Sequence, residues 1–427
     1  MGQIGFQRGQ GLGLLNTTAE KVSGLIGNGY VVEDGVQTGT LYALNNTSDA
    51  EALSITQAND IANHMLVWYH IDEFFRFNPG VKLYLWLEAA GVSMTNMCDI
   101  ANAKLTKMLQ MAGGAIYRVG VFKNADPGAD TLLDGFDEDV LNAIPKAQAQ
   151  RDLQVTLNRP IHIYLEGRHL NGAVGSVANL RGLAAPGVSV CIAQDLDVAA
   201  LDAKFSAHAA VGTLVGVKAS QPVNVNVGWV AKNNIQNTQG RATQGAFNIP
   251  IFVNPGLSSN LPLSHYNDNP VNGDFVTLGG TVETPGDGCI LPLTYQGTDG
   301  VYFNDDHTCT AITDDFYCAA NNETWNKAYR IIYIAQTPLV NSPVLVNPVD
   351  GTISPSVAQN FESVADDALR DNMQNQGEIS GRLVITDKNQ DVNETSKVVT
   401  TFEIVPVGTA REVTGTITLV TQVSQAA

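Results

Sequence analysis

The chain has 427 residues, of which 44% are hydrophobic and only 15% are charged. Soluble domains usually carry about 25% charged residues, and disordered chains combine low hydrophobicity with high net charge. The composition therefore excludes a disordered protein and predicts two or three packed domains at roughly 150 residues each. The low charge also indicates an apolar or neutral surface, as expected when subunits pack side by side.

The balance of charge narrows the possible partners. Lys and Arg number 24 against 42 Asp and Glu, a formal net charge of −18, and no Lys or Arg stands between Ala242 and Asn326. Because such a surface repels phosphate, we expect no nucleic-acid partner. We expect no membrane partner either, since no apolar run reaches the roughly 18 residues of a span and residues 1–6 lack a signal-peptide pattern. The 5 cysteines are scattered without a Cys-x-x-Cys pair, which favours a reduced, intracellular protein.

Residues 1–20 are rich in glycine and predict an extended N-terminal arm. Residues 21–232 then alternate between strand-like and helix-like runs. Helices are expected from Ser54 to the Asn78-Pro79-Gly80 break, at Met97–Ala112, after the acidic stretch Asp134–Asp139, and at Ala199–Ala207. Strands are expected at Tyr30–Glu33, Thr40–Leu44, Val81–Leu87, Ala115–Phe122, Ile161–Leu165, Val188–Ala193 and Val223–Val230. This order predicts an α/β domain with a mostly parallel sheet that is covered on both faces.

The rest of the chain changes in character. Residues 233–300 are rich in Asn, Gly and Pro and predict a loop-rich β segment. Residues 301–410 predict a mixed α+β domain. Its helices are expected at Asn321–Ala335 and Ser356–Asn375, and its strands at Gly300–Asn304, Ile379–Asp387 and Lys397–Val405. Residues 411–427 form a C-terminal arm, in which Glu412–Gln422 alternate like a strand.

No motif in the sequence indicates catalysis. Gly9 to Gly13 give a Gly-x-Gly-x-Gly spacing, but a dinucleotide site also needs a strand before it and a helix after it. Neither a Walker A motif nor a Gly-x-Ser-x-Gly elbow occurs. Glu166 with His169 is a common pair near a strand end, and Asp305-Asp306-His307 lacks the closing Glu of a calcium loop. We therefore predict a protein that is not an enzyme, with no catalytic residue, no cofactor and no metal.

Two features of the sequence point to assembly instead. The glycine-rich start and the Thr/Val-rich end of low charge would leave backbone groups unpaired in an isolated monomer. They make sense if each arm adds a strand to a neighbour's sheet. In addition, the helix at 356–375 is acidic, with Glu362, Asp366, Arg370 and Asp371 close together in sequence. A solvated face is the ordinary explanation of such a helix, and a surface for a basic partner is the alternative.

Three segments together carry a resemblance to a known family. They are the run from Tyr69 to Gly80 with the strand Lys82–Leu87, the run Gly300–Asp305 before a helix with Trp325, Ala328, Tyr329 and Arg330, and Gly381–Ile385 leading to Phe402–Ala410. The chain resembles contractile tail-sheath proteins of bacteriophages, in particular a compact family long described as a domain of unknown function. The resemblance covers roughly residues 20–425 in order, and residues 233–300 are not matched.

The resemblance implies a structural role. A sheath subunit polymerises as stacked hexameric rings around a tail tube, and contraction drives the tube through a target cell envelope. The implied partners are further copies of the chain, the tail tube protein, and baseplate and tail terminator proteins. The implied location is the virion, with assembly in the host cytoplasm. The implied strand-exchange contacts involve Gly2, Ile4, Phe6, Leu12, Leu14, Phe402, Ile404, Val413, Ile417 and Leu419. The residues expected to face the tube are Glu362, Asp366, Arg370 and Asp371.

Three alternatives remain at the level of sequence. The first is the sheath of a phage-like injection device or bacteriocin, which sequence alone does not separate from a phage tail. The second is another shell protein, which would lack the α/β half. The third is a cytosolic α/β enzyme with an unrecognised site at the carboxyl ends of its strands.

Overall fold

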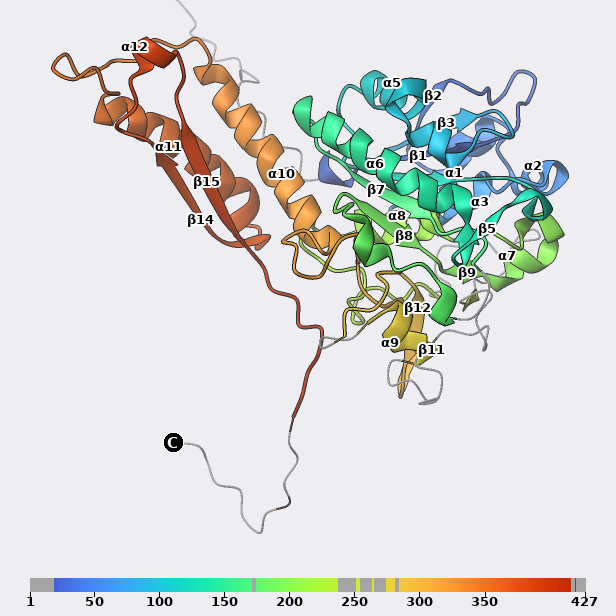
Figure 1. The fold of residues 1–427 in the computed structure, drawn as a ribbon. Helices are drawn as coiled ribbons and strands as arrows, with labels where there is room; N and C mark the ends of the chain where they lie inside the picture. The colour runs from blue at the N-terminus through green and yellow to red at the C-terminus, as the bar shows by residue number, and fades with distance from the viewer. Residues whose placement is uncertain are drawn as a thin grey trace, which may run out of the picture.

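The structure is a computed structural model that describes residues 19–170, 174–236, 251–253, 263–264, 274–280, 284–415 and 419. Figure 1 shows a large α/β domain and a smaller C-terminal lobe that projects from one side of it. The predicted N-terminal arm lies outside the described residues, apart from the short 3₁₀ turn Ala19–Lys21. Within the described residues, no helix combines the length and the apolar character that crossing a bilayer requires.

A six-stranded sheet in the order β2-β3-β1-β4-β7-β8 forms the centre of the large domain. Neighbouring strands are parallel except for β2, which runs antiparallel to β3. Most strand residues are buried, as a sheet covered on both faces requires. The predicted mostly parallel sheet is therefore confirmed. The strands are β1 (Ser23–Asn28), β2 (Leu41–Leu44), β3 (Leu83–Glu88), β4 (Arg118–Phe122), β7 (His162–Glu166) and β8 (Val188–Cys191).

Helices cover both faces of this sheet, with one apolar cluster under each layer. Gly212 shows how closely two helices of the first layer approach, because a Cβ there would lie 2.5 Å from the carbonyl oxygen of His70. The first layer contains α1 (Thr47–Ala52), α2 (Gln57–Asn63), α3 (Trp68–Phe77) and α8 (Val211–Ala219), and the second contains α4 (Met94–Cys98), α5 (Lys104–Met111) and α6 (Glu138–Thr156).

Two predicted helices of this domain are wrong as continuous elements. The helix expected from Ser54 is divided, because α2 ends at His64 in the left-handed region (φ 55°) and α3 begins at Trp68. The buried Asp60 carboxylate accepts the N–H groups of Trp68 and Tyr69, which stabilises the break. The helix expected at Met97–Ala112 is likewise divided between α4 and α5 at Ala103 (φ 52°).

Other differences from the predicted elements concern both strands and helices. The expected strands Val223–Val230 and Tyr30–Glu33 are absent, and turns and loops occupy these described segments. The helix expected at Ala199–Ala207 is α7 (Leu196–Leu201) followed by a 3₁₀ turn. Two elements were not predicted from the sequence: β1, because its glycines hide the strand pattern, and α8, because it is buried on all sides.

The described parts of residues 233–300 pack on the large domain. Ile290 bridges to Cys191 at the end of β8, and Ile290, Leu291 and Leu293 are buried. The described elements around this segment are β9 (Gln194–Asp195), which pairs with β10 (Phe252–Val253), β11 (Leu263–Ser264), α9 (Asp274–Leu278), β12 (Pro292–Tyr295) and β13 (Thr298–Phe303). A small hairpin of β5 (Leu132–Leu133) and β6 (Phe136–Asp137) precedes α6.

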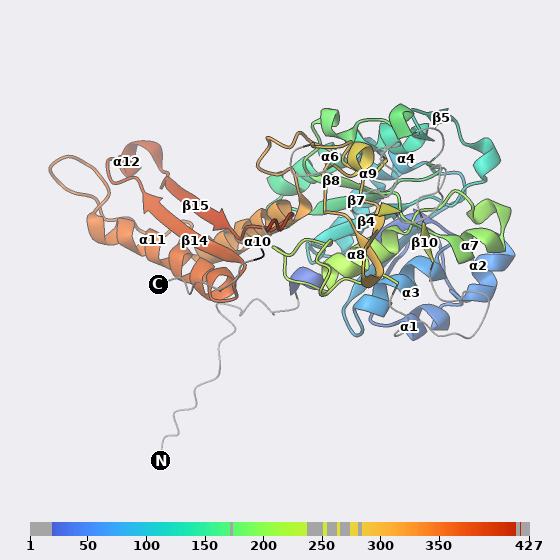
Figure 2. The same ribbon diagram turned by 90° about the horizontal axis from the view of Figure 1, so that it is seen from below.

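The C-terminal lobe is a helical layer against a two-stranded antiparallel sheet (Figure 2). Helix α10 (Ala319–Gln336) runs out of the large domain, and α11 (Pro355–Leu369) packs against both α10 and β14. A third apolar cluster, which includes Ile331, Leu369 and Val384, joins these elements. The remaining elements are a π-helical turn at Arg370–Gln374, β14 (Ile379–Thr386), α12 (Val392–Thr395) and β15 (Thr400–Pro406). The predicted helices and strands of this region are confirmed, with shifted ends.

Candidate assembly site

Helix α10 is shared by the two parts of the molecule. Its first half is buried in the large domain, where Glu323 accepts two hydrogen bonds from Arg118 at 2.9 and 2.7 Å and one from the Tyr164 hydroxyl at 2.9 Å. Burial by itself raises the pKa of Glu323, but the Arg118 guanidinium lowers it below the ordinary value. Glu323 is therefore ionised and paired inside the protein.

A second buried cation fixes the same helix. Arg330 donates hydrogen bonds to the carbonyl oxygens of Gly114, Ile116 and Pro160, and its guanidinium lies 4.0 Å from the centre of the Tyr117 ring. These carbonyl groups precede β4 and β7, so α10 is held at the amino ends of two central strands. An 18-residue helix is about 27 Å long. The C-terminal lobe is thus carried on a rigid strut rather than on a flexible linker.

The β14–β15 hairpin presents unpaired edges. Each strand pairs only with the other among the described residues, so each outer edge has no partner strand there. Val384 on the inner face is buried, whereas Leu383, Ile385 and Val405 are 47%, 49% and 56% exposed. An apolar two-stranded sheet with open edges is a ready template for a further strand.

An apolar groove of about 370 Å³ lies between α10 and β15. None of its lining residues comes from α11. A strand added at the outer edge of β15 would place alternate side chains over this groove, because successive side chains of a strand point to opposite faces. The groove is lined by Trp325, Ala328, Tyr329, Ile332 and Tyr333 of α10 and by Phe402 and Ile404 of β15.

The structure brings together some of the residues that the sequence singled out. Phe402 and Ile404 lie in the groove. Val413 is 90% exposed and Leu419 is 99% exposed, and residues 412–415 form no strand. The other predicted strand-exchange residues, Gly2, Ile4, Phe6, Leu12, Leu14 and Ile417, lie outside the described residues, as does most of the predicted strand Glu412–Gln422.

Ile332 and Tyr333 were not predicted from the sequence as groove residues. Their signal is the recurrence of apolar side chains on α10 at helical spacing, from Trp325 through Tyr329 to Tyr333. Tyr333 is 46% exposed, which the pattern by itself does not reveal.

The predicted tube-facing residues divide into two groups. Glu362 accepts the backbone N–H of Thr386, and Asp366 pairs with Arg382 at 2.6 Å, so both bind their own hairpin. Arg370 and Asp371 pair with each other on the exposed π-helical turn after α11. The outward acidic surface is therefore at the end of the helix, and a role in binding the tube stays a prediction for all four residues.

The edge where an α/β enzyme would hold a substrate is filled by internal partners. Lys123 pairs with Asp137 at 2.5 Å and with Asp130 at 3.5 Å, and His169 contacts Asp130 at 2.9 Å. Glu166 accepts the N–H groups of Lys123 and Ala209, and burial raises its pKa to about 7. The pair Glu166 and His169 is thus part of a structural network. Within the described part of the chain, no group of acidic, His and Cys side chains could hold a metal ion.

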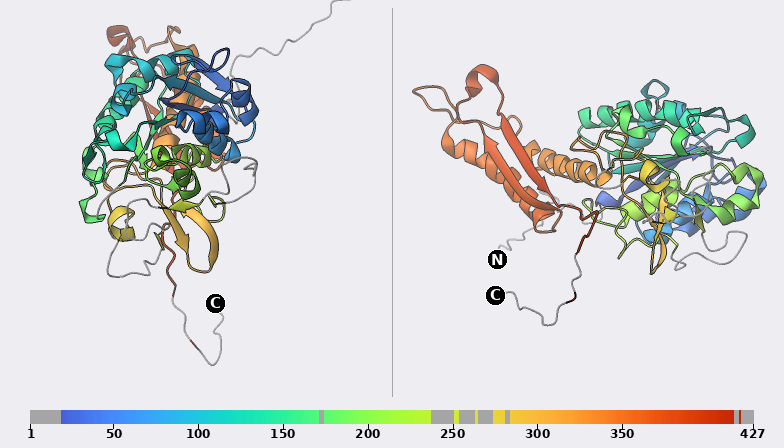
Figure 3. Two further views of the ribbon diagram at one scale, coloured as in Figure 1. Left: turned by 90° about the vertical axis from the view of Figure 1, so that its right-hand side faces the viewer. Right: turned by 60° about the horizontal axis from the view of Figure 1, so that its bottom comes forward.

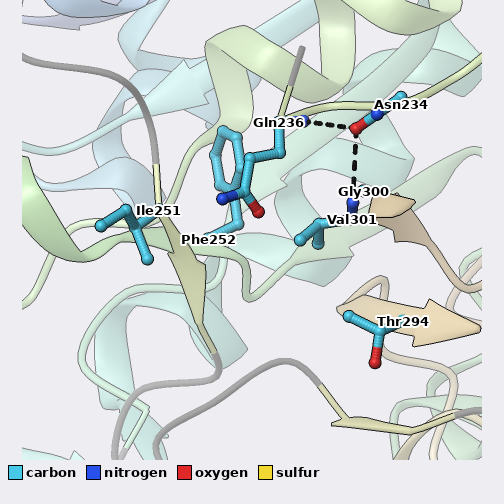
Figure 4. A pocket seen from close by; sticks show the side chains of 7 residues that line it. All are labelled: Asn234, Gln236, Ile251, Phe252, Thr294, Gly300 and Val301. Carbon is cyan, nitrogen blue, oxygen red and sulfur yellow. Dashed lines mark hydrogen bonds between the residues drawn. The ribbon is translucent and has the colours of Figure 1, made fainter. Parts of the chain in front are cut away.

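A second pocket, of about 460 Å³, lies in the large domain (Figure 4). The Asn234 side-chain oxygen accepts the N–H groups of Gln236 and Val301 and braces one wall. Its described lining contains no titratable side chain, so these residues supply no general acid or base, and the Thr294 hydroxyl has no base among them to activate it.

Comparisons with known proteins agree with this division of the chain. Residues 6–307 match the family model described as the DUF2586 N-terminal domain, and residues 315–424 match the DUF2586 C-terminal domain. The two matches meet between β13 and α10. No curated protein matches the chain in sequence.

Solved structures share the fold over nearly the whole chain. A chain of the anti-feeding prophage (AFP) helical sheath in the contracted state is 14% identical, covers 98% of both chains and has a TM-score of 0.58. A chain of the AFP baseplate is 12% identical, covers 94% of this chain and 93% of that one, and has a TM-score of 0.57. A chain of the PVC sheath complex of an extracellular contractile injection system, also contracted, is 12% identical, covers 93% and 91%, and has a TM-score of 0.53.

Proposed function

Because the chain belongs to the DUF2586 family over both of its domains, we propose that it is the sheath subunit of a contractile injection system. The observation that carries the proposal is the end-to-end likeness to a helical sheath chain, which covers 98% of both chains. At 14% identity this likeness concerns the fold, and the assembly argument comes from the hairpin and the groove.

The proposed contact is strand addition between copies of the chain. The arms 1–20 and 411–427 are the donors, and the hairpin of β14 and β15 is the acceptor. A strand of five or six residues forms several backbone hydrogen bonds at about 1 kcal/mol net each and buries its inward side chains. The α10–β15 groove favours this contact, because Tyr333 and Ile404 offer apolar surface to those side chains.

The described subunit suits a contractile machine mechanically. Helix α10 fixes the lobe to the large domain through Arg118–Glu323 and Arg330. Each subunit would therefore move as one rigid body while the arms keep neighbours linked. Heterologous contacts of this kind build helical assemblies, and two packings of the same subunits form a switch without nucleotide hydrolysis. In this proposal the chain is a structural protein and not an enzyme.

The proposed partners follow from the same arrangement. They are further copies in stacked hexameric rings, an inner tube, and baseplate and terminator proteins at the two ends. The likeness to a chain of the AFP baseplate structure supports the baseplate as a partner. The exposed turn with Asp371 is the proposed tube contact, with Asp367 beside it, because the side chains of both remain more than half exposed.

From the sequence, a phage tail is the first interpretation and an injection device the second. The similar sheath structures come from injection systems, so the second interpretation has the better support. If the sheath is instead that of a phage tail, the protein would be located in the virion and assembled in the host cytoplasm. Particles purified from cells expressing the neighbouring genes would separate the two, since a phage carries a DNA-filled capsid and an injection device does not.

A matched pair of variants tests the groove. Tyr333 and Ile334 are adjacent on α10 and similarly exposed, at 46% and 45%, but only Tyr333 lines the groove. Tyr333→Glu places a charge where an added strand would bury apolar groups, so we expect at least a tenfold loss of polymer in sedimentation and electron microscopy. Ile334→Glu should retain polymer. Equal polymer yields from both variants would contradict a role for the groove.

A further inference from the structure

One side chain ties the segment after β15 back to the large domain. Arg411 Nε donates to Asp305 Oδ2 at 2.6 Å, Nη2 donates to Asp305 Oδ1 at 3.2 Å, and Nη1 donates to the Tyr317 hydroxyl at 2.9 Å. The guanidinium also lies 5.1 Å from the centre of the Tyr317 ring. A planar group that binds both oxygens of one carboxylate has a defined orientation, unlike a single-point contact.

The neighbours of Arg411 lack this attachment. Residues 408–410 and 412–415 are all exposed, and none of them belongs to a helix or strand. Arg411 is the half-buried exception within this stretch. Figure 3 shows the chain after β15 running back to the base of the lobe, beside the large domain. Among residues 408–415, Arg411 is thus the side chain whose hydrogen bonds to the large domain the structure describes.

The receiving site is built into the large domain. The Asn226 amide donates to both Asp305 and Asp306, and Lys218 lies 3.6 Å from Asp306. Asp306 also accepts, through its backbone and side-chain oxygens, the first N–H groups of α10 at 2.7 Å each. The chain thus leaves the large domain at this point through α10 and forms the C-terminal lobe. It then contacts the large domain again at Arg411.

The contact is also placed so that it can open. The Arg411 side chain is 24% exposed and that of Asp305 11%, whereas the Arg118–Glu323 pair is 0% and 2% exposed. Separating Arg411 from Asp305 would disturb no helix, strand or apolar cluster, because the flanking residues are exposed. On separation the Arg411 guanidinium would return to water, whereas the buried Asp305 carboxylate would keep the Asn226 amide and the Asp306 N–H as donors.

From these contacts we propose that Arg411 is an intrasubunit latch that fixes the C-terminal segment at the base of α10 and so determines which neighbour the segment can reach. With the latch closed, residues 412–427 can reach at most about 55 Å from Arg411. With the latch open, residues 407–427 can reach at most about 70 Å from the end of β15. The latch itself concerns a single subunit. Its role in selecting a neighbour rests on the proposed function.

The latch is tested in the full chain by a distance measurement. All 5 native cysteines are buried, so spin labels can be attached to Cys introduced at Val413 and Ile312, which are exposed. We expect a narrow label-to-label distribution with Arg411. Arg411→Ala should broaden it to about 13 Å, the spread of a free tether of about six residues. Arg370→Ala, which removes an exposed arginine from the same lobe, should leave it narrow.

Each outcome decides one part of the proposal. An unchanged distribution in Arg411→Ala, with an unchanged melting temperature, would overturn the latch. A broadened distribution with undiminished polymer would overturn its role in selecting a neighbour, for which we expect at least a fivefold loss of ordered polymer. If the parent chain forms no polymer even when mixed with its tube protein while the distribution broadens, the latch stands and the proposed function fails.

Discussion

The buried pair between Arg118 and Glu323 gives the sharpest test of the claim that α10 is a rigid strut. Glu323→Gln keeps the shape of the side chain and removes its charge. Arg118 is then left fully buried without a counter-ion, and its Nη1 already lacks a hydrogen-bond partner among the described residues. Breaking one side of a buried ion pair costs about 3–5 kcal/mol. This is a large part of a typical unfolding free energy of about 5–15 kcal/mol.

Urea unfolding of the full chain, followed by tryptophan fluorescence, measures this loss. Trp325 lies on α10, two residues after Glu323, and the other three of the 4 tryptophans lie in the large domain, so the signal includes the strut and the domain that holds it. We expect the unfolding free energy to fall by about 3–5 kcal/mol. Glu51→Gln, at an exposed position on α1, is the matched control and should stay within about 0.5 kcal/mol of the parent. A loss below about 1 kcal/mol in Glu323→Gln would refute the reasoning, because the pair would then not anchor the helix.

Two further predictions concern the large domain. Gly212→Ala should destabilise the chain by about 1–3 kcal/mol in thermal unfolding, because its Cβ would meet the His70 backbone, whereas Gly175→Ala, with open space around it, should have little effect. A destabilised Gly175→Ala with an unaffected Gly212→Ala would contradict the close approach of α3 and α8. Burial, with a smaller contribution from His208, lowers the pKa of His70 to about 3, so the unfolded chain binds a proton below pH 6.5 that the folded chain does not. Stability from this group is complete above pH 6.5 and is lost as the pH falls, so the advantage of the parent over His70→Gln should shrink by about 1.4 kcal/mol per pH unit between pH 6.5 and 4. A constant difference across that range would show that His70 is not buried in its neutral form.

The sequence predicted elements whose pattern is local. The runs that became β3, β4 and β7 are apolar and bounded by breakers, and α10 and α11 carry helical spacing over many residues. Strand β1 was missed because Gly24 and Gly27 interrupt it. A Cβ at Gly27 would lie 2.3 Å from the Phe122 ring, so the residue is set by a neighbouring strand and not by its own segment.

Contacts between residues that are far apart in the sequence could not be predicted, because sequence patterns are local. Arg118 and Glu323 are 205 positions apart, and Arg411 and Asp305 are 106 apart. No spacing rule connects such residues, although each pair decides how the lobe or the segment after it is held. In the acidic helix α11, by contrast, a local pattern was visible but the partners of its side chains were not. Its spacing suggested one shared face, but Glu362 and Asp366 are used by β14 within the subunit.

The measurement that tests the central claim most directly is electron microscopy of the purified full chain beside a chain that lacks residues 1–15. The account predicts long hollow cylinders from the full chain and their loss on truncation, because the N-terminal arm would supply a strand to a neighbouring hairpin. Cylinders that persist unchanged without the arm would contradict it, as would discrete small particles from the full chain even when its tube protein is present as a template.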